Sequence, residues 1–257
     1  MSNLASAFAD TNTAFIGFVT GGDPSLEASE EFICAMATAG ADVIEIGVPF
    51  SDPIAEGPVI QRANIRALGA GTTVEGIFTL VQRVRQKTLV PLVLLTYLNP
   101  VFRYGYEAFF RRCAQVGVDG IIIPDLPFEE QDELREFAVA QGIDLISMIA
   151  PTSDTRIQQI CQRALGFIYL VSSMGVTGER SRISGDLAAT TARIRECCAL
   201  PVAVGFGVST PEQAAQIAQY ANGVIVGSAL VRLIEQHGAQ ATGYLEDYIH
   251  TMKRAMA

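Results

Sequence analysis

One short pattern, a glycine followed two residues later by an aspartate, recurs along the chain and constrains its fold more than any other feature. At Gly40-Ala-Asp42, Gly117-Val-Asp119 and Gly142-Ile-Asp144, a glycine suited to a helix C-terminus is followed by a short entry into an apolar run. Helix-like and strand-like segments alternate in this way from end to end. This alternation predicts βαβ units and a parallel sheet.

Eight apolar runs are expected to be strands, at residues 14–20, 42–48, 91–97, 119–124, 143–149, 167–172, 201–206 and 222–227. Helices are expected near 25–39, 59–69, 73–87, 105–116, 129–141, 154–165, 186–198, 211–220 and 239–255, with a short extra N-terminal helix near 2–10 and an extra helical turn after Ser228. Because none of the eight runs has the polar character of an edge strand, the sheet is expected to close. The expected fold class is α/β, a single (β/α)8 TIM barrel domain over residues 1–257.

Composition excludes several classes of partner and location. The net charge of −9, with no local basic run, argues against nucleic acid and anionic membrane surfaces. The longest apolar run, near residues 89–98, is about half of a membrane span and is interrupted by Pro91. Residues 1–10 lack a basic start and a long apolar stretch, so no export signal is visible and a cytoplasmic location is expected.

Scarce residue types exclude several mechanisms. The chain has two lysines, Lys87 and Lys253, and neither lies at the C-terminal end of an expected strand, where a barrel enzyme needs a Schiff-base lysine. The two histidines, His237 and His250, form no cluster with carboxylates, so no metal site is expected. The 5 cysteines show no CxxC spacing, so neither disulfides nor a thiolate metal site is expected. Acid–base chemistry would therefore fall to carboxylates.

Glu45 is the most informative carboxylate because it interrupts the apolar run of residues 42–48. Burying it there costs several kcal/mol unless it is hydrogen-bonded or protonated, and burial raises a carboxyl pKa. A loop stiffened by prolines follows at residues 49–58 and carries Asp52 and Glu56. Three acidic side chains near one strand end form a candidate acid–base site.

The C-terminal ends of the strands form the catalytic face of such a barrel. Phe18, Tyr97, Phe102 and Tyr169 lie near these ends and would wall a pocket for a flat apolar ligand, although plain packing is the alternative.

Two glycine-containing strand ends predict a phosphate site. Gly205 and Gly207 follow the seventh strand and precede a Ser/Thr-capped helix, and Gly227-Ser228 opens a helix after the eighth. Two adjacent helix N-termini with glycine amides suit phosphate, whereas ordinary turn glycines are the alternative. Residues 175–185 are polar and glycine-flanked, which predicts a mobile lid or a solvated loop.

Together these residues resemble the α subunit of tryptophan synthase, over essentially the whole chain. The resemblance is carried by Phe18-Val-Thr-x-Gly-Asp23-Pro24, Glu45-x-Gly-Val-Pro-Phe-Ser-Asp-Pro-x-Ala-Glu56-Gly-Pro, Asp125-x-Pro127, Gly175-Val-Thr-Gly178 and Gly205-Phe-Gly207. It implies a lyase that splits indole-3-glycerol phosphate into indole and glyceraldehyde 3-phosphate. It also implies an α2β2 heterotetramer, in which a β subunit carries pyridoxal phosphate and this chain carries no cofactor.

The resemblance assigns roles to individual residues. Glu45 would protonate indole C3 and later take the glycerol hydroxyl proton, and Glu56 would accept the indole N–H. Further roles fall on substrate-binding Phe18, Tyr97, Asp125, Tyr169 and Thr177, with Thr177 joining the lid to the strand-two loop, and on phosphate-binding Gly178, Gly207, Gly227 and Ser228.

Two departures and two alternatives accompany the resemblance. Glu56 stands where most family members carry Asp, and Ser173 stands where many carry Arg. A ribulose-phosphate-binding barrel that closes the indole ring or isomerises phosphoribosylanthranilate predicts a lysine or cysteine at a strand end, and this chain has neither there. A phosphate-binding barrel that only regulates its partner requires Glu45 to be merely structural.

Overall fold

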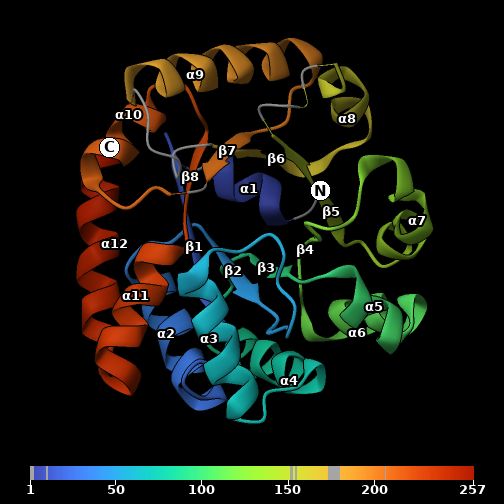
Figure 1. Ribbon diagram of the computed structural model, residues 1–257, viewed down its shortest axis with the longest axis vertical. Coiled ribbons are helices and arrows are strands. Elements are labelled where there is room, and N and C mark those ends of the chain that lie inside the picture. The colour runs from blue at the N-terminus through green and yellow to red at the C-terminus, as the bar shows by residue number, and fades with distance from the viewer. Residues whose placement is uncertain (1–2, 10, 151–152, 154, 173–179, 206) are drawn as a thin grey trace.

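The computed structural model describes residues 3–9, 11–150, 153, 155–172, 180–205 and 207–257, with side chains left out for 180–186. In this part of the chain, eight parallel strands close into a barrel in sequential order, with β1 pairing both β2 and β8, and helices surround them as an outer ring (Figure 1). The strands are β1 (Ala14–Thr20), β2 (Val43–Gly47), β3 (Leu92–Leu95), β4 (Gly120–Ile122), β5 (Asp144–Ile149), β6 (Leu165–Val171), β7 (Val202–Gly205) and β8 (Gly223–Val226). The predicted (β/α)8 barrel is confirmed.

The α-helices of the described part are α1 (Asn3–Ala9), α2 (Leu26–Thr38), α3 (Pro58–Gly69), α4 (Val74–Arg85), α5 (Leu98–Tyr104), α6 (Tyr106–Val116), α7 (Asp132–Ala140), α8 (Ile157–Arg163), α9 (Arg180–Cys197), α10 (Pro211–Ala218), α11 (Ser228–His237) and α12 (Thr242–Met256). Short 3-10 turns lie at Phe128–Glu130 and Gly238–Gln240. Within the described residues, none of these helices is both long enough and apolar enough to cross a membrane.

Two apolar layers follow from the alternation of side chains along each strand. On β1, Phe15 and Val19 point outward and join the large core between strands and helices. Ile16 points inward and packs with Val43, Val93 and other residues inside the barrel. A fully buried parallel strand is apolar on both faces for this reason, so the strands read as continuous hydrophobic runs.

The N-terminal helix α1 closes one end of the barrel. Leu4 belongs to the inner core, and the Phe8 and Phe167 rings lie 5.4 Å apart. A Cβ at Gly120 would lie 2.9 Å from Leu4 Cδ1, so this strand glycine makes room for the helix. Because α1 covers the N-terminal ends of the strands, their C-terminal ends are left for the loops that carry the candidate residues.

Several predicted boundaries are wrong, each for an identifiable reason. Between the expected strand at 91–97 and the expected helix at 105–116, where no helix was expected, helix α5 forms, because a proline such as Pro100 is tolerated in a first helical turn. The extra turn after Ser228 is a helix of 10 residues, which buries Leu230, Val231 and Ile234. Strand β6 starts at Leu165, earlier than expected, and its pairing with β5 shifts register between Ile146 and Ser147.

Candidate active site

Glu45 lies in the middle of β2 and faces the inside of the barrel. The strand register places Phe18 of β1 on one side of it and Val93 of β3 on the other. The side chain is 1% exposed, and its Oε1 makes no hydrogen bond to any described residue. Ile44 and Ile46, which flank it in sequence, belong to the outer core, so the groups that bury Glu45 come from neighbouring strands.

Burial controls the protonation of Glu45. Removing the carboxyl from water disfavours its charged form and raises its pKa to about 8. Glu45 is therefore mainly protonated at neutral pH and able to give a proton, while remaining close enough to neutrality to act as a base once ionised.

Phe18 connects Glu45 with the other parts of the site. Its ring packs with Ala63 of α3 and Val231 of α11, and Val59 and Ile60 of α3 lie against the same cluster. A Cβ added at Gly227 would lie 3.6 Å from Phe18. The helix after the strand-two loop and the end of β8 therefore meet at the residue that pairs with Glu45 in register.

Glu56 lies in the strand-two loop and is half-buried. Its Oε2 accepts a hydrogen bond from Asn64 Nδ2 of α3 at 2.6 Å. Burial raises its pKa to about 7, although the bond from Asn64 acts in the opposite direction. Glu56 is thus ionised in a substantial fraction of molecules at neutral pH, unlike Glu45.

Tyr97 anchors the strand-two loop to the end of β3. Its hydroxyl accepts the Ala55 N–H at 3.0 Å, and its ring stacks on Phe50 with centroids 5.2 Å apart. Burial chiefly, with the charges of Glu56 and Asp125 adding to it, raises the pKa of Tyr97 to about 12. The structure therefore ties Tyr97 to the loop that carries Glu56, and its contact with substrate stays a prediction.

Tyr169 lies inside the barrel on β6 and is 7% exposed. Burial and then the charge of Glu45 raise its pKa well above the ordinary value, so the two side chains interact across the barrel. A Cβ at Gly205 would lie 2.5 Å from the Tyr169 hydroxyl. The missing side chain of Gly205 therefore makes room for Tyr169, and the approach of a ligand to its backbone stays a prediction.

Asp125 lies after β4, and one of its carboxylate oxygens is already engaged. Its Oδ1 accepts the N–H of Leu98, the first residue of α5, at 2.9 Å. It also lines a cavity of about 290 Å³ with Leu98, Asn99, Phe102 and Tyr106. Its contact with substrate stays a prediction.

The two helix ends expected to bind phosphate differ. The N-terminus of α10 is satisfied by its own capping box, in which Thr210 Oγ1 accepts from Gln213 N at 3.3 Å and Gln213 Oε1 accepts from Thr210 N at 3.1 Å. The N-terminus of α11 at Gly227 has no side-chain cap. Its first-turn amides thus remain available to an anion. At the α10 end, the residue left to contribute a backbone N–H to phosphate is Gly207, whose φ is +82°.

Gly227→Ala tests the phosphate contribution of α11 with little strain, because φ is −115° and the added Cβ meets atoms no closer than 3.6 Å. We expect the fold to persist and the affinity for glycerol phosphate to fall about tenfold, since the methyl group narrows the space beside Phe18 and the helix end. Isothermal titration calorimetry measures this. Gly207 is a poorer test because its positive φ strains any L residue. Unchanged affinity in Gly227→Ala would remove this helix end from the phosphate site.

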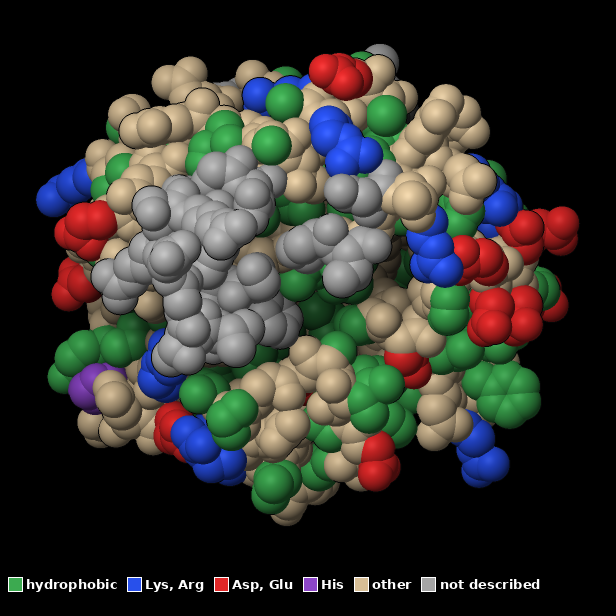
Figure 2. Space-filling view, turned by 45° about the horizontal axis from the view of Figure 1, so that its top comes forward, with side chains coloured by type: hydrophobic (Ala, Val, Ile, Leu, Met, Phe, Trp, Pro, Cys, Tyr) green, Lys and Arg blue, Asp and Glu red, His purple; other side chains and the backbone are tan. Residues whose placement is uncertain are grey.

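Thr177, Gly178 and Ser173 lie outside the described residues, so their expected roles stay predictions. The interpretation of residues 175–185 as one loop is wrong in its second half, because α9 begins at Arg180. Figure 2 shows a hollow floored by hydrophobic side chains near the middle of the face in view.

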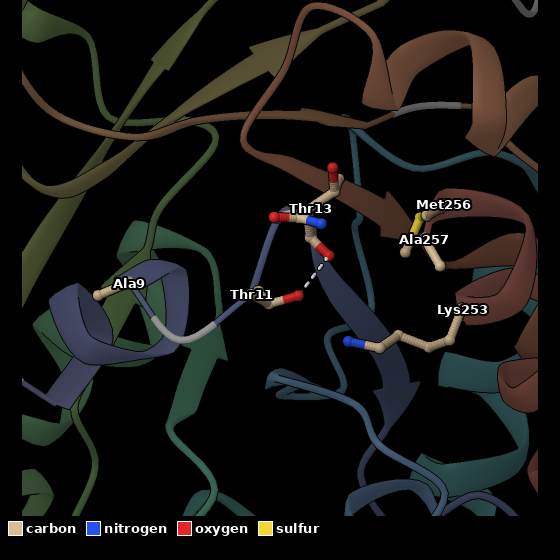
Figure 3. Close-up of a pocket in the computed structure, with 7 residues that line it drawn as sticks. Ala9, Thr11, Thr13, Lys253, Met256 and Ala257 are labelled. Carbon is tan, nitrogen blue, oxygen red and sulfur yellow. Dashed lines mark hydrogen bonds between the residues drawn. The ribbon is translucent and has the colours of Figure 1, made fainter.

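A cavity of about 400 Å³ lies away from these carboxylates, between the end of α1, residues 11–13 and the last turn of α12 (Figure 3). Two of its polar side chains are engaged within the fold. Lys253 Nζ contacts Asp42 Oδ2 at 2.6 Å, and Thr11 Oγ1 donates to the Thr13 carbonyl at 3.2 Å. This cavity therefore has no part in the acid–base site.

Neither lysine reaches the C-terminal face of the barrel. Lys253 pairs with Asp42, and Lys87 contacts Glu30 at 2.7 Å. Neither lysine therefore lies at a strand end, which argues against the barrel class that closes the indole ring or isomerises phosphoribosylanthranilate. All five cysteines carry free thiols. Within the described residues, no group of three His, Cys, Asp or Glu side chains is placed to hold a metal ion.

Two features of the site were missed from the sequence. Asn64 is buried between Ala63 and Ala67 on the inner face of α3, and a lone amide on an apolar helix face is the signal that points to it. Asp23 is 1% exposed and forms a two-point ion pair with Arg66 of α3 at 2.8 and 2.7 Å. No spacing in the sequence pairs these two residues.

Comparisons with known proteins decide the family. The profile described as tryptophan synthase alpha chain matches residues 4–257. The chain belongs to the tryptophan synthase alpha chain family. The tryptophan synthase alpha chain of Lactiplantibacillus plantarum is 51% identical over 100% of this chain and 97% of that protein.

Solved structures of the family agree with this membership. The tryptophan synthase alpha subunit of Legionella pneumophila matches with a TM-score of 0.91 and 34% identity, covering 100% of this chain and 98% of that one. A chain of the tryptophan synthase α2β2 complex of Pyrococcus furiosus matches with a TM-score of 0.88 and 38% identity, covering 94% of this chain and 98% of that one. The described barrel therefore has the fold of the family.

Proposed function

We propose that this chain catalyses the α reaction of tryptophan synthase, the cleavage of indole-3-glycerol phosphate to indole and glyceraldehyde 3-phosphate. The observation that carries the proposal is a pair of carboxyl groups in different surroundings: Glu45 is buried in the barrel with an oxygen that no described residue bonds, and Glu56 in the strand-two loop accepts a hydrogen bond from Asn64. Two carboxyls in unequal environments supply an acid and a charge acceptor at the same pH.

Glu45 carries the proton transfers. Its carboxyl group protonates indole C3, and the bond from C3 to the glycerol chain then breaks. The resulting Glu45 carboxylate takes the proton of the adjacent hydroxyl, whose carbon becomes the aldehyde of glyceraldehyde 3-phosphate. One proton enters at C3 and one leaves the hydroxyl, so Glu45 ends the cycle protonated.

Glu56 stabilises the charge on the ring. Protonation at C3 places positive charge on the indole nitrogen. The hydrogen bond from the ring N–H to an ionised carboxylate is strongest at that moment. Phe18 and Tyr97 flank the ring, Tyr169 and Asp125 border the site, and the uncapped N-terminus of α11 holds the phosphate. For Thr177 and Gly178, which lie outside the described residues, we propose a tie to the strand-two loop and a contact with the phosphate, respectively.

A purely regulatory role is the weaker alternative. It requires Glu45 to be structural, yet a buried carboxyl with an unsatisfied oxygen costs stability and contributes none by itself. Incubating the purified chain with indole-3-glycerol phosphate separates the two functions. Release of indole and glyceraldehyde 3-phosphate in equal amounts supports the lyase, and the absence of both products, with and without a β subunit, contradicts it.

The β subunit is the partner, and it carries the pyridoxal phosphate of the complex, whereas this chain carries no cofactor. We infer that it docks beside the strand-two loop and α5, because Ile54 and Phe102 are 81% and 64% exposed there. Exposed apolar side chains next to a site suit an interface. We propose a cytoplasmic location for both partners, where a biosynthetic enzyme meets its substrate.

Partner binding is expected to accelerate cleavage. The strand-two loop carries Glu56, and an ordered loop holds that carboxylate in reacting geometry for a larger fraction of time. We expect turnover of indole-3-glycerol phosphate to rise at least about tenfold with a saturating β subunit. Steady-state indole release, measured with and without the partner, tests this. Equal turnover in both conditions would rule out an effect of the partner on this loop.

A further inference from the structure

Asn64 holds the carboxylate of Glu56. Its Nδ2 donates to Glu56 Oε2 at 2.6 Å, and the Asn64 side chain is 3% exposed. An amide nitrogen only donates, so this bond favours the ionised carboxylate over the protonated acid. The buried amide is therefore placed to set both the position and the charge of Glu56.

The helix that carries Asn64 is braced on two sides. Arg66 forms a two-point ion pair with the buried Asp23, which precedes α2. Arg62 contacts Glu235 of α11 through two hydrogen bonds of 2.7 and 2.9 Å. Two-point pairs fix orientation as well as distance. The two ion pairs thus hold the helix that carries Asn64 in place. A residue that positions another side chain needs such a fixed backbone.

The other groups around Glu56 do not replace this bond. Arg62 and Arg66 are engaged with Glu235 and Asp23, and no cation in the described part of the chain pairs with Glu56. Among the causes that act on the pKa of Glu56, burial raises it and the bond from Asn64 lowers it.

Acidic and phenolic neighbours act on Glu56 less directly. Tyr97 faces it from the end of β3 and stays neutral below pH 12, and Asp125 lies beyond Tyr97. Asp52 is exposed in the same loop and accepts a bond of 2.5 Å from the Ser51 hydroxyl. Glu45, in β2, is protonated at neutral pH because its pKa is about 8.

We propose that Asn64 is a positioning residue that keeps Glu56 ionised and in a fixed rotamer, and so allows a glutamate to act where the resemblance implies an aspartate. The proposal rests on the proposed function. Glutamate has one more methylene and one more rotatable bond than aspartate, and a displacement near 1 Å can cost about 100-fold in rate. The bond to Asn64 removes that freedom.

Binding of two unreactive phosphates tests the proposal. One is 3-(indol-3-yl)propyl phosphate, and the other is its benzofuran counterpart, in which oxygen replaces the ring N–H. The ratio of their affinities isolates the contact with Glu56, because the titration of the phosphate affects both equally. Calorimetric titrations from pH 6 to 9 would compare the wild type with Asn64→Ala, Asn64→Asp and Gln61→Ala.

In Asn64→Ala we expect the preference for the indole probe to fall about fivefold at pH 7 and its pH midpoint to rise by about one unit. Asn64→Asp is nearly isosteric, so it preserves packing, and its added charge raises the midpoint further. Gln61→Ala removes only a bond of 2.8 Å to the Glu56 backbone carbonyl, and the midpoint stays at the wild-type value.

The role of Asn64 would be overturned by an equal loss of affinity for both probes. It would also be overturned if the pH midpoint of the preference for the indole probe were unshifted in both Asn64 variants. This readout is independent of turnover. A wild type that binds both probes with the expected preference but never cleaves indole-3-glycerol phosphate would overturn the proposed function instead.

Discussion

Replacing Glu45 by glutamine is expected to lower the turnover of indole-3-glycerol phosphate by about 10²- to 10⁴-fold, the usual cost of losing a general acid–base group. The amide has nearly the same shape as the protonated acid that a pKa of about 8 maintains at neutral pH. It can neither give the proton to C3 nor take one from the hydroxyl. Folding and analogue binding should therefore persist, and single-turnover release of indole measures the loss.

A matched control separates chemistry from charge. Glu31→Gln makes the same change on the exposed face of α2, and turnover should stay at the wild-type value. If Glu45→Gln retained a tenth or more of wild-type turnover, Glu45 would not be the proton donor. Loss of analogue binding in step with turnover would instead indicate a structural role in the barrel interior.

Substitutions at Glu56 are expected to have the second largest effect. Glu56→Ala and Glu56→Gln remove the charge that faces the indole N–H, and we expect each to lose about 100-fold in kcat/KM. Glu56→Asp keeps the charge, but its shorter side chain lies farther from Asn64 Nδ2, which is 2.6 Å from Oε2 in the wild type. This variant should therefore retain a measurable share of wild-type kcat/KM. Steady-state assays with the β subunit present measure all three.

Asp52 provides the control for the strand-two loop, because it is acidic and exposed and its carboxylate accepts a hydrogen bond from the neighbouring Ser51 hydroxyl. Asp52→Asn should leave kcat/KM of the isolated chain unchanged, and this control is measured without the β subunit because the partner is proposed to dock beside this loop. Wild-type turnover in Glu56→Ala would show that Glu56 has no catalytic role. Asp52 and Asp125 would then have to be tested as the charge acceptor.

The barrel could be predicted from the sequence because its strands are buried on both faces. Such strands read as apolar runs, and the glycine at each helix end marks where the next run begins. Helix α5 was missed because Pro100 reads as a turn, although a first helical turn accepts it. The start of β6 was missed because a register shift depends on the neighbouring strand, which no local pattern reveals.

The site was predictable where a residue contradicts its surroundings. Glu45 stands out as an acid within an apolar run, and the structure places it in the barrel interior. The groups that hold the site were not predictable in the same way. Asn64 meets Glu56 only after the loop folds back on α3, and Gly205 accommodates Tyr169 from another strand. Contacts between distant segments leave little local signal.

The pH dependence of kcat/KM tests the central claim most directly, because it reports the essential acid and base of the free enzyme. Glu56 must be ionised, so the rate should rise as the pH passes about 7. Glu45 must be protonated, so the rate should fall as the pH passes about 8. The account predicts a narrow bell between these values, from which Glu56→Gln removes the acidic limb. A rate that stays constant from pH 6 to 9 would contradict it.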